Sequence, residues 1–261
     1  MKTTAIMNLK GGTAKTVSTI NMAAILSKIY EMRVLLVDAD SQGNLSEFTA
    51  ADPAALRDAK GTAEMLREDG FDLLETKIPG VSLIPGSTDL MDLDVSTVRS
   101  GLAQPMALAD TLDRLGGEKA FDYCLIDCPP AFSAAAMAAL AAADDVVIPV
   151  KLDAFGIRGL VKLTAQIRNM RKINPDLEIA GVLPTMYYTS AGQRQAEAEL
   201  RASLEKLGIR CFQHIRRSPS VDGSTFEQSP LVYYSPKSGA CRDYKIFVRD
   251  LIGEEAEDYG V

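Results

Sequence analysis

The chain has 261 residues, 47% of them apolar, which is enough for a sizeable core in one large α/β domain or two small ones. Its net charge of −7 argues against a generic nucleic-acid binder, and its single histidine excludes a histidine-based metal site or catalytic triad. No run reaches the roughly 18 apolar residues that span a bilayer, and Met1-Lys2 leads straight into a strand-like segment without a signal peptide, so we expect a cytoplasmic protein.

Apolar, strand-like runs alternate with helix-length segments along the chain. In chain order we expect strands at residues 3–8, 33–38, 81–86, 123–128, 145–150, 179–185 and 209–215, helices at 15–29, 157–172 and 191–207, and a polar, helix-like insertion beside the active face at 45–75. The strands are nearly all apolar rather than alternating, which is typical of a parallel sheet covered on both faces. Repeated strand–helix units imply right-handed crossovers, so the expected fold is α/β, a doubly wound, mostly parallel sheet flanked by helices.

No long glycine-, serine- or proline-rich linker divides the chain, and it contains no internal repeat. We therefore expect residues 1–252 to form a single domain and residues 253–261 to form an acidic, flexible tail. The charge is uneven, because residues 1–150 carry a net charge of −9 and residues 151–252 carry +6. The later part of the chain can present a basic face although the whole protein is acidic.

The segment NLKGGTAKTVSTI, residues 8–20, is predicted to bind phosphate. Gly11 and Gly12 let backbone N–H groups approach a phosphate closely, because they place no Cβ atom in the way. The helix expected near Lys15 brings its N-terminus behind the loop. Lys15 can reach the β- and γ-phosphates, and the Thr16 hydroxyl can ligate Mg²⁺. The alternative is a glycine-rich turn between a strand and a helix that carries lysines by chance.

Carboxylates follow two of the expected strands. Asp38 ends one strand and Asp40 follows it, and Asp127 lies near the end of the strand at residues 123–128. Because ligands of doubly wound sheets bind at the carboxyl ends of strands, we expect these carboxylates to converge with the loop on one metal–phosphate site. The alternatives are a solvated turn for Asp38 and Asp40 and a helix cap for Asp127.

The loop also resembles a known motif. KGGTAKT (residues 10–16) looks like the deviant Walker A sequence K-G-G-x-x-K-[ST] of the ParA/MinD branch of P-loop ATPases. LLVDADSQGN (35–44), YCLIDCPP (123–130), GVLPTMY (181–187) and YSPKSGACRDY (234–244) are similar to further stretches of that family. The resemblance covers nearly the whole chain and is closest to the short, Soj-like chromosome and plasmid partition ATPases. Those lack an N-terminal helix-turn-helix domain, for which this chain has no room before Thr3.

The resemblance implies roles for individual residues. Lys10 matches the signature lysine, which crosses a dimer interface to the partner's phosphates and neutralises charge there as an arginine finger does. Asp40 matches the aspartate that positions the attacking water, and Asp38 and Asp127 would support the metal and its waters. The implied sets are catalytic Lys10, Lys15 and Asp40; nucleotide-binding Gly11, Gly12, Thr13, Ala14, Lys15, Thr16 and Val17; and metal-binding Thr16, Asp38 and Asp127.

Two positions depart from the family pattern. Ala14 replaces the usual glycine before the lysine, which costs about 1 kcal/mol if that position needs a positive φ and nothing if it is already helical. Ser41 replaces the usual proline after Asp40. Neither change removes a catalytic group, so we expect ATP binding to survive, and the two positions bear on the rate of hydrolysis.

The resemblance implies an Mg²⁺-dependent ATPase with slow intrinsic turnover. ATP would drive formation of a homodimer that binds DNA without sequence preference, and a ParB-like activator would stimulate hydrolysis. In the family, DNA binds to a basic C-terminal face, and here Ser190 and Ser220 stand where arginines are often found. The candidate DNA-binding residues are Arg217, Arg242, Lys245 and Arg249. If they bind DNA, the protein associates with the nucleoid; the alternative is that they are ordinary solvated charges.

Two other functions remain open from the sequence. The first is a ParA-like ATPase that positions a protein cargo without binding DNA, which a scatter of the basic residues over different faces would favour. The second is a nucleotide-locked scaffold with little hydrolysis, for which Ala14 and Ser41 are the only support. A membrane role is rejected, because residues 245–261 end in an acidic run rather than a basic amphipathic helix. ATP is favoured over GTP by the resemblance and by the absence of an N-K-x-D guanine motif.

Overall fold

Short apolar segments, buried along almost their whole length, form the central strands of a seven-stranded sheet. The computed structural model describes residues 1–93 and 106–253. Within that part the strands are β1 (Lys2–Ile6), β2 (Val34–Asp38), β3 (Leu74–Glu75), β4 (Val81–Ile84), β5 (Tyr123–Asp127), β6 (Asp145–Lys151) and β7 (Glu178–Thr185). Their order across the sheet is β3-β4-β2-β5-β1-β6-β7, and every neighbouring pair is parallel except β3–β4.

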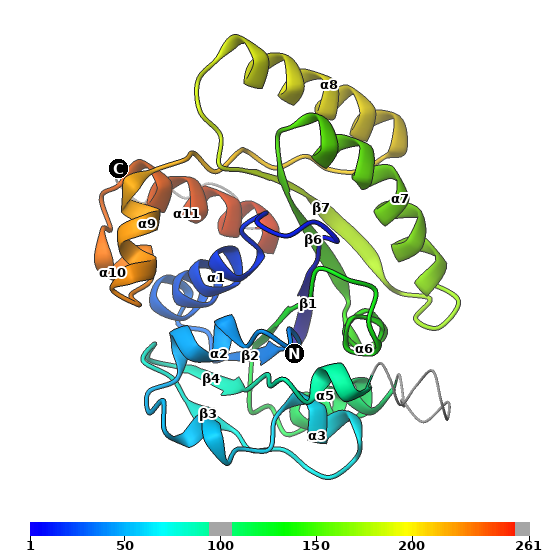
Figure 1. Cartoon of the computed structure of the whole chain (residues 1–261), viewed down its shortest axis with the longest axis vertical. Coiled ribbons are helices and arrows are strands. Elements are labelled where there is room, and N and C mark those ends of the chain that lie inside the picture. Colours follow the sequence, from blue (N-terminus) through cyan, green and yellow to red (C-terminus); the bar gives the residue numbers. More distant parts are fainter. Residues whose placement is uncertain (94–105, 254–261) are drawn as a thin grey trace.

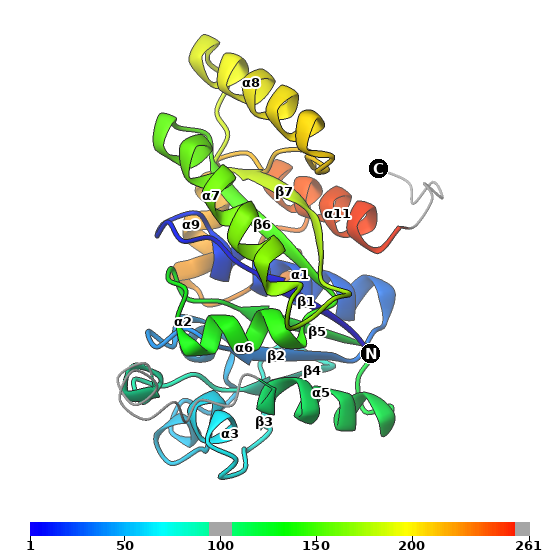
Figure 2. The ribbon, with the colours of Figure 1, turned by 90° about the vertical axis from the view of Figure 1, so that its right-hand side faces the viewer.

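Helices cover both faces of this sheet, with α5, α6 and α7 on one side and α1 and α11 on the other (Figures 1 and 2). The helices are α1 (Lys15–Tyr30), α2 (Asn44–Thr49), the 3-10 turn η1 (Ala55–Arg57), α3 (Thr62–Leu66), α5 (Ala107–Gly117), α6 (Ala134–Ala142), α7 (Ala154–Met170), α8 (Ala191–Leu207), α9 (Pro219–Phe226), α10 (Leu231–Tyr234) and α11 (Gly239–Ile252). Two buried apolar clusters, one on each face, result from this layering. The predicted α/β, doubly wound and mostly parallel fold is confirmed.

Strand register brings the ends of three central strands to one edge of the sheet. Ile6 at the end of β1 lies opposite Asp127 of β5, and Asp38 at the end of β2 lies opposite the same residue. The chain leaves β1 through the glycine-rich loop and enters α1 at Lys15. The loop and two of the predicted carboxylates are therefore neighbours because of topology alone.

The prediction of a strand at residues 209–215 is wrong. This segment runs beside β7 and forms only isolated bridges, such as Val182 with Cys211. Val182 N donates to Arg210 O, and Phe212 N donates to Val182 O, but Pro184 has no N–H for the next bond. Ile215 N donates to Pro184 O instead. The apolar pattern at 209–215 serves the core, where Phe212 and Ile215 are both buried.

The segment at residues 45–75, expected as a helix-like insertion, folds into α2, η1 and α3 followed by β3. The predicted tail falls almost wholly outside the described residues, because the description ends at Gly253. The single domain of residues 1–252 stays a prediction. Among the helices that the structure describes, none is both long and apolar enough to cross a bilayer.

Candidate nucleotide site

The loop between β1 and α1 turns through left-handed backbone positions at Gly12, with φ 68°, and at Ala14, with φ 64°. A Cβ atom built at Gly11 or Gly12 would meet nothing within 4 Å, so a ligand can approach the backbone there without a side chain in its way. The helix begins at Lys15 without a side-chain cap on its first turn. The helix N-terminus therefore offers its N–H groups and the positive end of its dipole to an anion.

The side chains of Asn8 and Thr185 tie this loop to the strands beside it. Asn8 Nδ2 donates to Pro149 O at 2.7 Å, and Asn8 Oδ1 accepts from Lys10 N at 3.0 Å. On the far side, Thr185 Oγ1 donates to Thr13 O at 3.1 Å. Because β6 and β7 hold both ends of the loop, the neighbouring strands fix its shape.

Thr16 is joined directly to the carboxylate at the end of β5. Its Oγ1 donates to Asp127 Oδ2 at 2.6 Å, and Thr19 Oγ1 lies 3.4 Å from Asp127 Oδ1. Burial, and secondarily the charge of Asp38, raises the pKa of Asp127 to about 8. A nearby cation lowers that pKa, as Lys15 already does in part. The arrangement favours a positively charged ligand next to Asp127.

Asp38 has a mainly internal role in the structure. Its side chain is fully buried, and Oδ2 accepts from Ser46 N at 2.9 Å and from Ser46 Oγ at 2.7 Å. Oδ1 accepts from Asp40 N at 3.1 Å. Burial raises the pKa of Asp38 to about 6 in spite of these hydrogen bonds. Asp38 thus fixes the turn that presents Asp40 and the start of α2.

The residues present fit Mg²⁺ bound together with a nucleotide. In residues 1–93 and 106–253, no group of three His, Cys, Asp or Glu side chains could hold a metal ion by itself. Mg²⁺ commonly takes only one or two protein ligands and completes its shell with phosphate oxygens and water. The Thr16 hydroxyl, backed by Asp127, meets that limited requirement.

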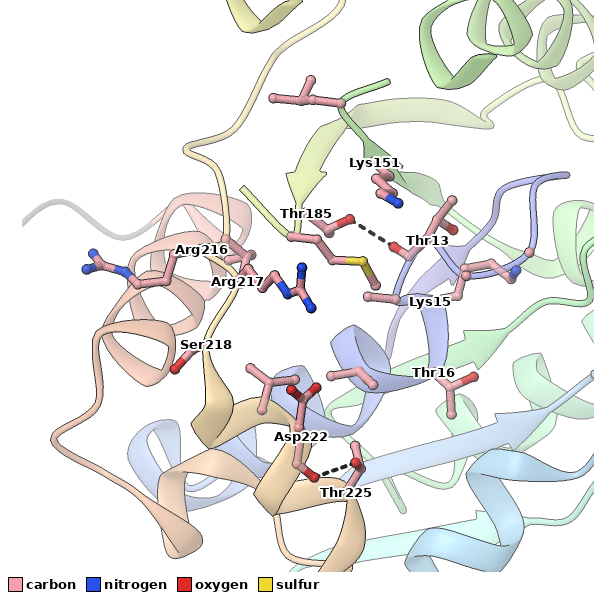
Figure 3. A pocket seen from close by; sticks show the side chains of 18 of the residues that line it. Thr13, Lys15, Thr16, Lys151, Thr185, Arg216, Arg217, Ser218, Asp222 and Thr225 are labelled. Carbon is pink, nitrogen blue, oxygen red and sulfur yellow. Dashed lines mark hydrogen bonds between the residues drawn. The ribbon is translucent and has the colours of Figure 1, made fainter. Parts of the chain in front are cut away.

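A cavity of about 1000 Å³ opens in front of the loop (Figure 3). That volume lies at the upper end of the range for ligand pockets, roughly 300–1000 Å³. All of the predicted nucleotide-binding residues line it, and so does Asp40, which is largely buried and accepts from Gln42 N at 3.0 Å. The opposite wall comes from α9 and the segment that leads into it, where Asp222 and Arg217, respectively, face the cavity.

Lys10 is paired inside its own subunit. Its Nζ donates to Asp153 Oδ2 at 2.6 Å and to Oδ1 at 2.8 Å. Both side chains remain about one-third exposed, at 37% and 31%. The predicted trans-acting lysine is therefore available at the surface, and a carboxylate two residues beyond β6 holds it there.

The predicted DNA-binding residues separate into two places. Arg242, Lys245 and Arg249 lie on α11 at spacings of three and four residues, which puts them along one side of the helix. Arg249 also contacts Asp250, with Nη2 3.1 Å from Oδ1. Arg217 lies on the segment before α9, on the wall of the nucleotide cavity. The structure thus groups three of the four residues and places the fourth elsewhere.

Several cavity residues were missed by the sequence reasoning. Lys151 ends β6, and Gln193 lies in the first turn of α8. Gln193 Nε2 donates to Leu152 O at 2.8 Å, and its Oε1 is the buried side-chain atom in the described residues that has no hydrogen-bond partner. The rule that ligands bind at strand ends would have found Lys151, since the strand itself was predicted. No local pattern marks Gln193.

Comparison with known proteins places these features in a family. A family model described as an AAA domain matches residues 1–179. The chain is 35% identical over 258 residues to the chromosome-partitioning ATPase Soj of Thermus thermophilus, covering 97% of this chain and 96% of that protein. It is 30% identical over 261 residues to the chromosome partitioning protein ParA of Caulobacter vibrioides, covering 98% and 96% of the two chains.

Solved structures with the same fold include complexes with nucleotides. An ATP complex of a variant of McdA from Cyanothece matches with a TM-score of 0.81 and 25% identity, covering 98% of each chain. Cobyrinic acid a,c-diamide synthase from Mycobacterium smegmatis with bound ADP and magnesium matches with a TM-score of 0.78 and 28% identity, covering 97% of this chain and 94% of that one. Both cover nearly the whole chain, as the sequence resemblance does.

Proposed function

The chain belongs to the ParA/Soj family of P-loop partition ATPases, and from this premise we propose that it is an ATP-driven dimeric switch for DNA segregation. It is an ATPase, and nucleotide and magnesium are used in this family. The observation that carries the proposal is the cavity before the loop, which Lys15, Thr16 and Asp40 line together. The steps below assign roles to those side chains.

Binding of the phosphate chain falls to the loop and the start of α1. The backbone at Gly11 and Gly12 would lie against the phosphates, with the Lys15 ammonium beside them. Thr16 would hold Mg²⁺ with Asp127 behind it and Asp38 as a more distant support. When bound, the metal ion supplies neutralisation of phosphate charge. Asp40, held in place by its backbone bond to Asp38, would orient the attacking water.

Dimerisation follows from the position of Lys10. The side chain leaves Asp153 and reaches the phosphates bound by a second copy of the chain, where it neutralises charge that develops during hydrolysis. ATP stabilises the dimer to the extent that it binds the dimer more tightly than the monomer. Intrinsic turnover is slow, because Lys10 and the water must be aligned at once. A ParB-like activator protein would speed this alignment.

The proposed DNA contact is the stripe of Arg242, Lys245 and Arg249 on α11. The excess of basic residues in 151–252 supports it, since phosphate contacts by lysine and arginine supply non-specific affinity. Arg217 is assigned to the nucleotide cavity rather than to this stripe, because its guanidinium lies on the cavity wall. In this proposal the protein works in the cytoplasm and stays on DNA while ATP is bound.

The test is retention of the protein on non-specific duplex DNA, with ATP and Mg²⁺, at low and high salt. We expect ATP-dependent retention that falls steeply with salt. Replacing Arg242 and Lys245 by alanine reduces retention and lowers the salt slope by about two, roughly one per lost phosphate contact. The matched control replaces two other exposed lysines by alanine, Lys162 on α7 and Lys172 just after it. This control variant should show unchanged retention.

A second function, positioning of a protein cargo without DNA, is favoured by one observation. The predicted basic residues are divided between two elements, because Arg217 lies on the segment before α9 that lines the cavity and the others lie on α11. Intact ATP-dependent dimerisation combined with salt-independent or absent DNA retention would select this function over DNA segregation.

A further inference from the structure

Lys151 brings a second lysine to the nucleotide cavity, opposite the loop that contains Lys15. It is the last residue of β6, its side chain is exposed, and Figure 3 shows it among the residues that line the cavity, above Thr13. None of the roles proposed above for Lys10, Lys15 and Thr16 involves Lys151. A cation at the end of a central strand, facing an anion-binding loop, calls for a chemical explanation.

The backbone of Lys151 has a fixed position relative to the loop. Lys151 pairs with Thr185 in the register of β6 and β7. The Thr185 hydroxyl contacts both Thr13 O of the loop, at 3.1 Å, and Val150 O, at 3.3 Å. The same hydroxyl therefore ties the loop to the residue that precedes Lys151. Any ligand held by the loop lies at a defined place relative to the Lys151 stem.

The ammonium group of Lys151 makes no ion pair or hydrogen bond within the part of the chain that the structure describes. The acid closest to it in sequence, Asp153, is engaged by Lys10 at 2.6 Å. Lys15 faces the same cavity and is 7% exposed. Two cations that share one cavity repel each other when it is empty, and an anionic ligand between them is attracted by both.

We propose that Lys151 binds the phosphate chain of the nucleotide in its own subunit and makes the site favour ligands with more phosphate charge. The inference rests on the proposed nucleotide site and adds a residue to it. A lysine suits this role because its ammonium is a point charge on a flexible four-carbon stem, which reaches a phosphate without a rigid approach. The contribution grows with ligand charge, so it is largest for ATP, smaller for ADP and smallest for AMP.

The experiment compares equilibrium binding of ATP, ADP and AMP, each with Mg²⁺, to the wild type, Lys151→Gln and Lys151→Arg. Binding is measured at protein concentrations where light scattering reports a monomer, so that a partner subunit does not contribute. Lys162→Gln is the matched control, because Lys162 is an exposed lysine on α7 that does not line the cavity.

We expect Lys151→Gln to weaken ATP binding about tenfold, as loss of one charge-assisted contact does, and to weaken AMP binding less. Lys151→Arg keeps most of the affinity, and Lys162→Gln keeps all of it. Added salt weakens ATP binding by the wild type more than by Lys151→Gln. Because the Lys151 ammonium has no partner among the described residues, thermal unfolding of ligand-free Lys151→Gln matches that of the wild type.

Failure of this inference is distinct from failure of the proposed function. If Lys151→Gln binds all three nucleotides like the wild type while Lys15→Ala binds none, the nucleotide site stands and the role of Lys151 is wrong. If Lys151→Gln loses the same factor for ATP, ADP and AMP and also unfolds at a lower temperature, its role is structural and the inference is overturned. Normal ATP binding by Lys15→Ala would remove the proposed site itself.

Discussion

Lys10 Nζ lies 2.6 Å from Asp153 Oδ2 of the same subunit, although 143 positions separate the two residues in sequence. The pair forms because the loop after β1 and the turn after β6 leave neighbouring strands at the same edge of the sheet. In the proposed mechanism Lys10 acts on a nucleotide in another subunit. The internal pair must therefore break before Lys10 can act.

Replacing Asp153 by asparagine is expected to release Lys10. A partly exposed ion pair contributes up to about 1 kcal/mol, so ATP-dependent dimerisation and basal hydrolysis should increase by up to about fivefold. Steady-state phosphate release and sedimentation measure the two effects. The control is Asp153→Asn combined with Lys10→Ala, which should show no gain in hydrolysis. A slower Asp153→Asn enzyme would mean that Asp153 supports the active arrangement instead of restraining it.

The left-handed conformation of Ala14 determines how much stability the protein loses by carrying alanine instead of glycine at this position. At φ 64° an L side chain is strained by about 1–2 kcal/mol, and alanine recovers about 0.4–1 kcal/mol by restricting the unfolded chain. Ala14→Gly should therefore raise the free energy of unfolding by about 0.5 kcal/mol, measured by urea denaturation without nucleotide. Ala202→Gly on the exposed side of α8 is the control and should lower it by about 0.5–1 kcal/mol. Equal losses for both variants would contradict strain at Ala14.

The Thr16–Asp127 contact predicts a dependence on magnesium. Thr16→Ser keeps a hydroxyl 2.6 Å from Asp127 Oδ2, so hydrolysis should stay within about threefold of the wild type. Thr16→Ala loses this hydroxyl. We expect the alanine variant to hydrolyse ATP at least about tenfold more slowly at low Mg²⁺, with partial recovery at high Mg²⁺. Hydrolysis rates across a magnesium titration provide the measurement. Equal magnesium curves for the serine and alanine variants would exclude Thr16 as a ligand.

Much of the site could be predicted from sequence because its parts are local. The glycine pair, Lys15 and Thr16 follow one another within one short segment. The rule that ligands bind at the carboxyl ends of strands brings Asp127 beside them without knowledge of any side-chain contact. The conformation of Ala14 could only be stated as two alternatives, since a sequence does not show the sign of φ. The structure selects the strained alternative.

Other features depend on long-range contacts that no local pattern records. Residues 209–215 carry the apolar residues of a strand, yet Pro184 on the neighbouring strand removes the N–H that a regular ladder needs. Asp38 has the same sequence signal as Asp127, but its oxygens are occupied by Ser46 and the Asp40 backbone. The pairing of Lys10 with Asp153 joins two loops that are distant in sequence and was not predicted.

The central claim is that nucleotide bound at Lys15 drives two copies of the chain together. Sedimentation velocity of the wild type, Lys10→Ala and Lys15→Ala, each with Mg²⁺ and either ATP, ADP or no nucleotide, tests it most directly. The account predicts a wild-type dimer with ATP alone and a Lys15→Ala protein that stays monomeric throughout. Lys10→Ala should still bind ATP but lose activator-stimulated hydrolysis. Normal ATP-dependent dimerisation of Lys15→Ala would contradict the account.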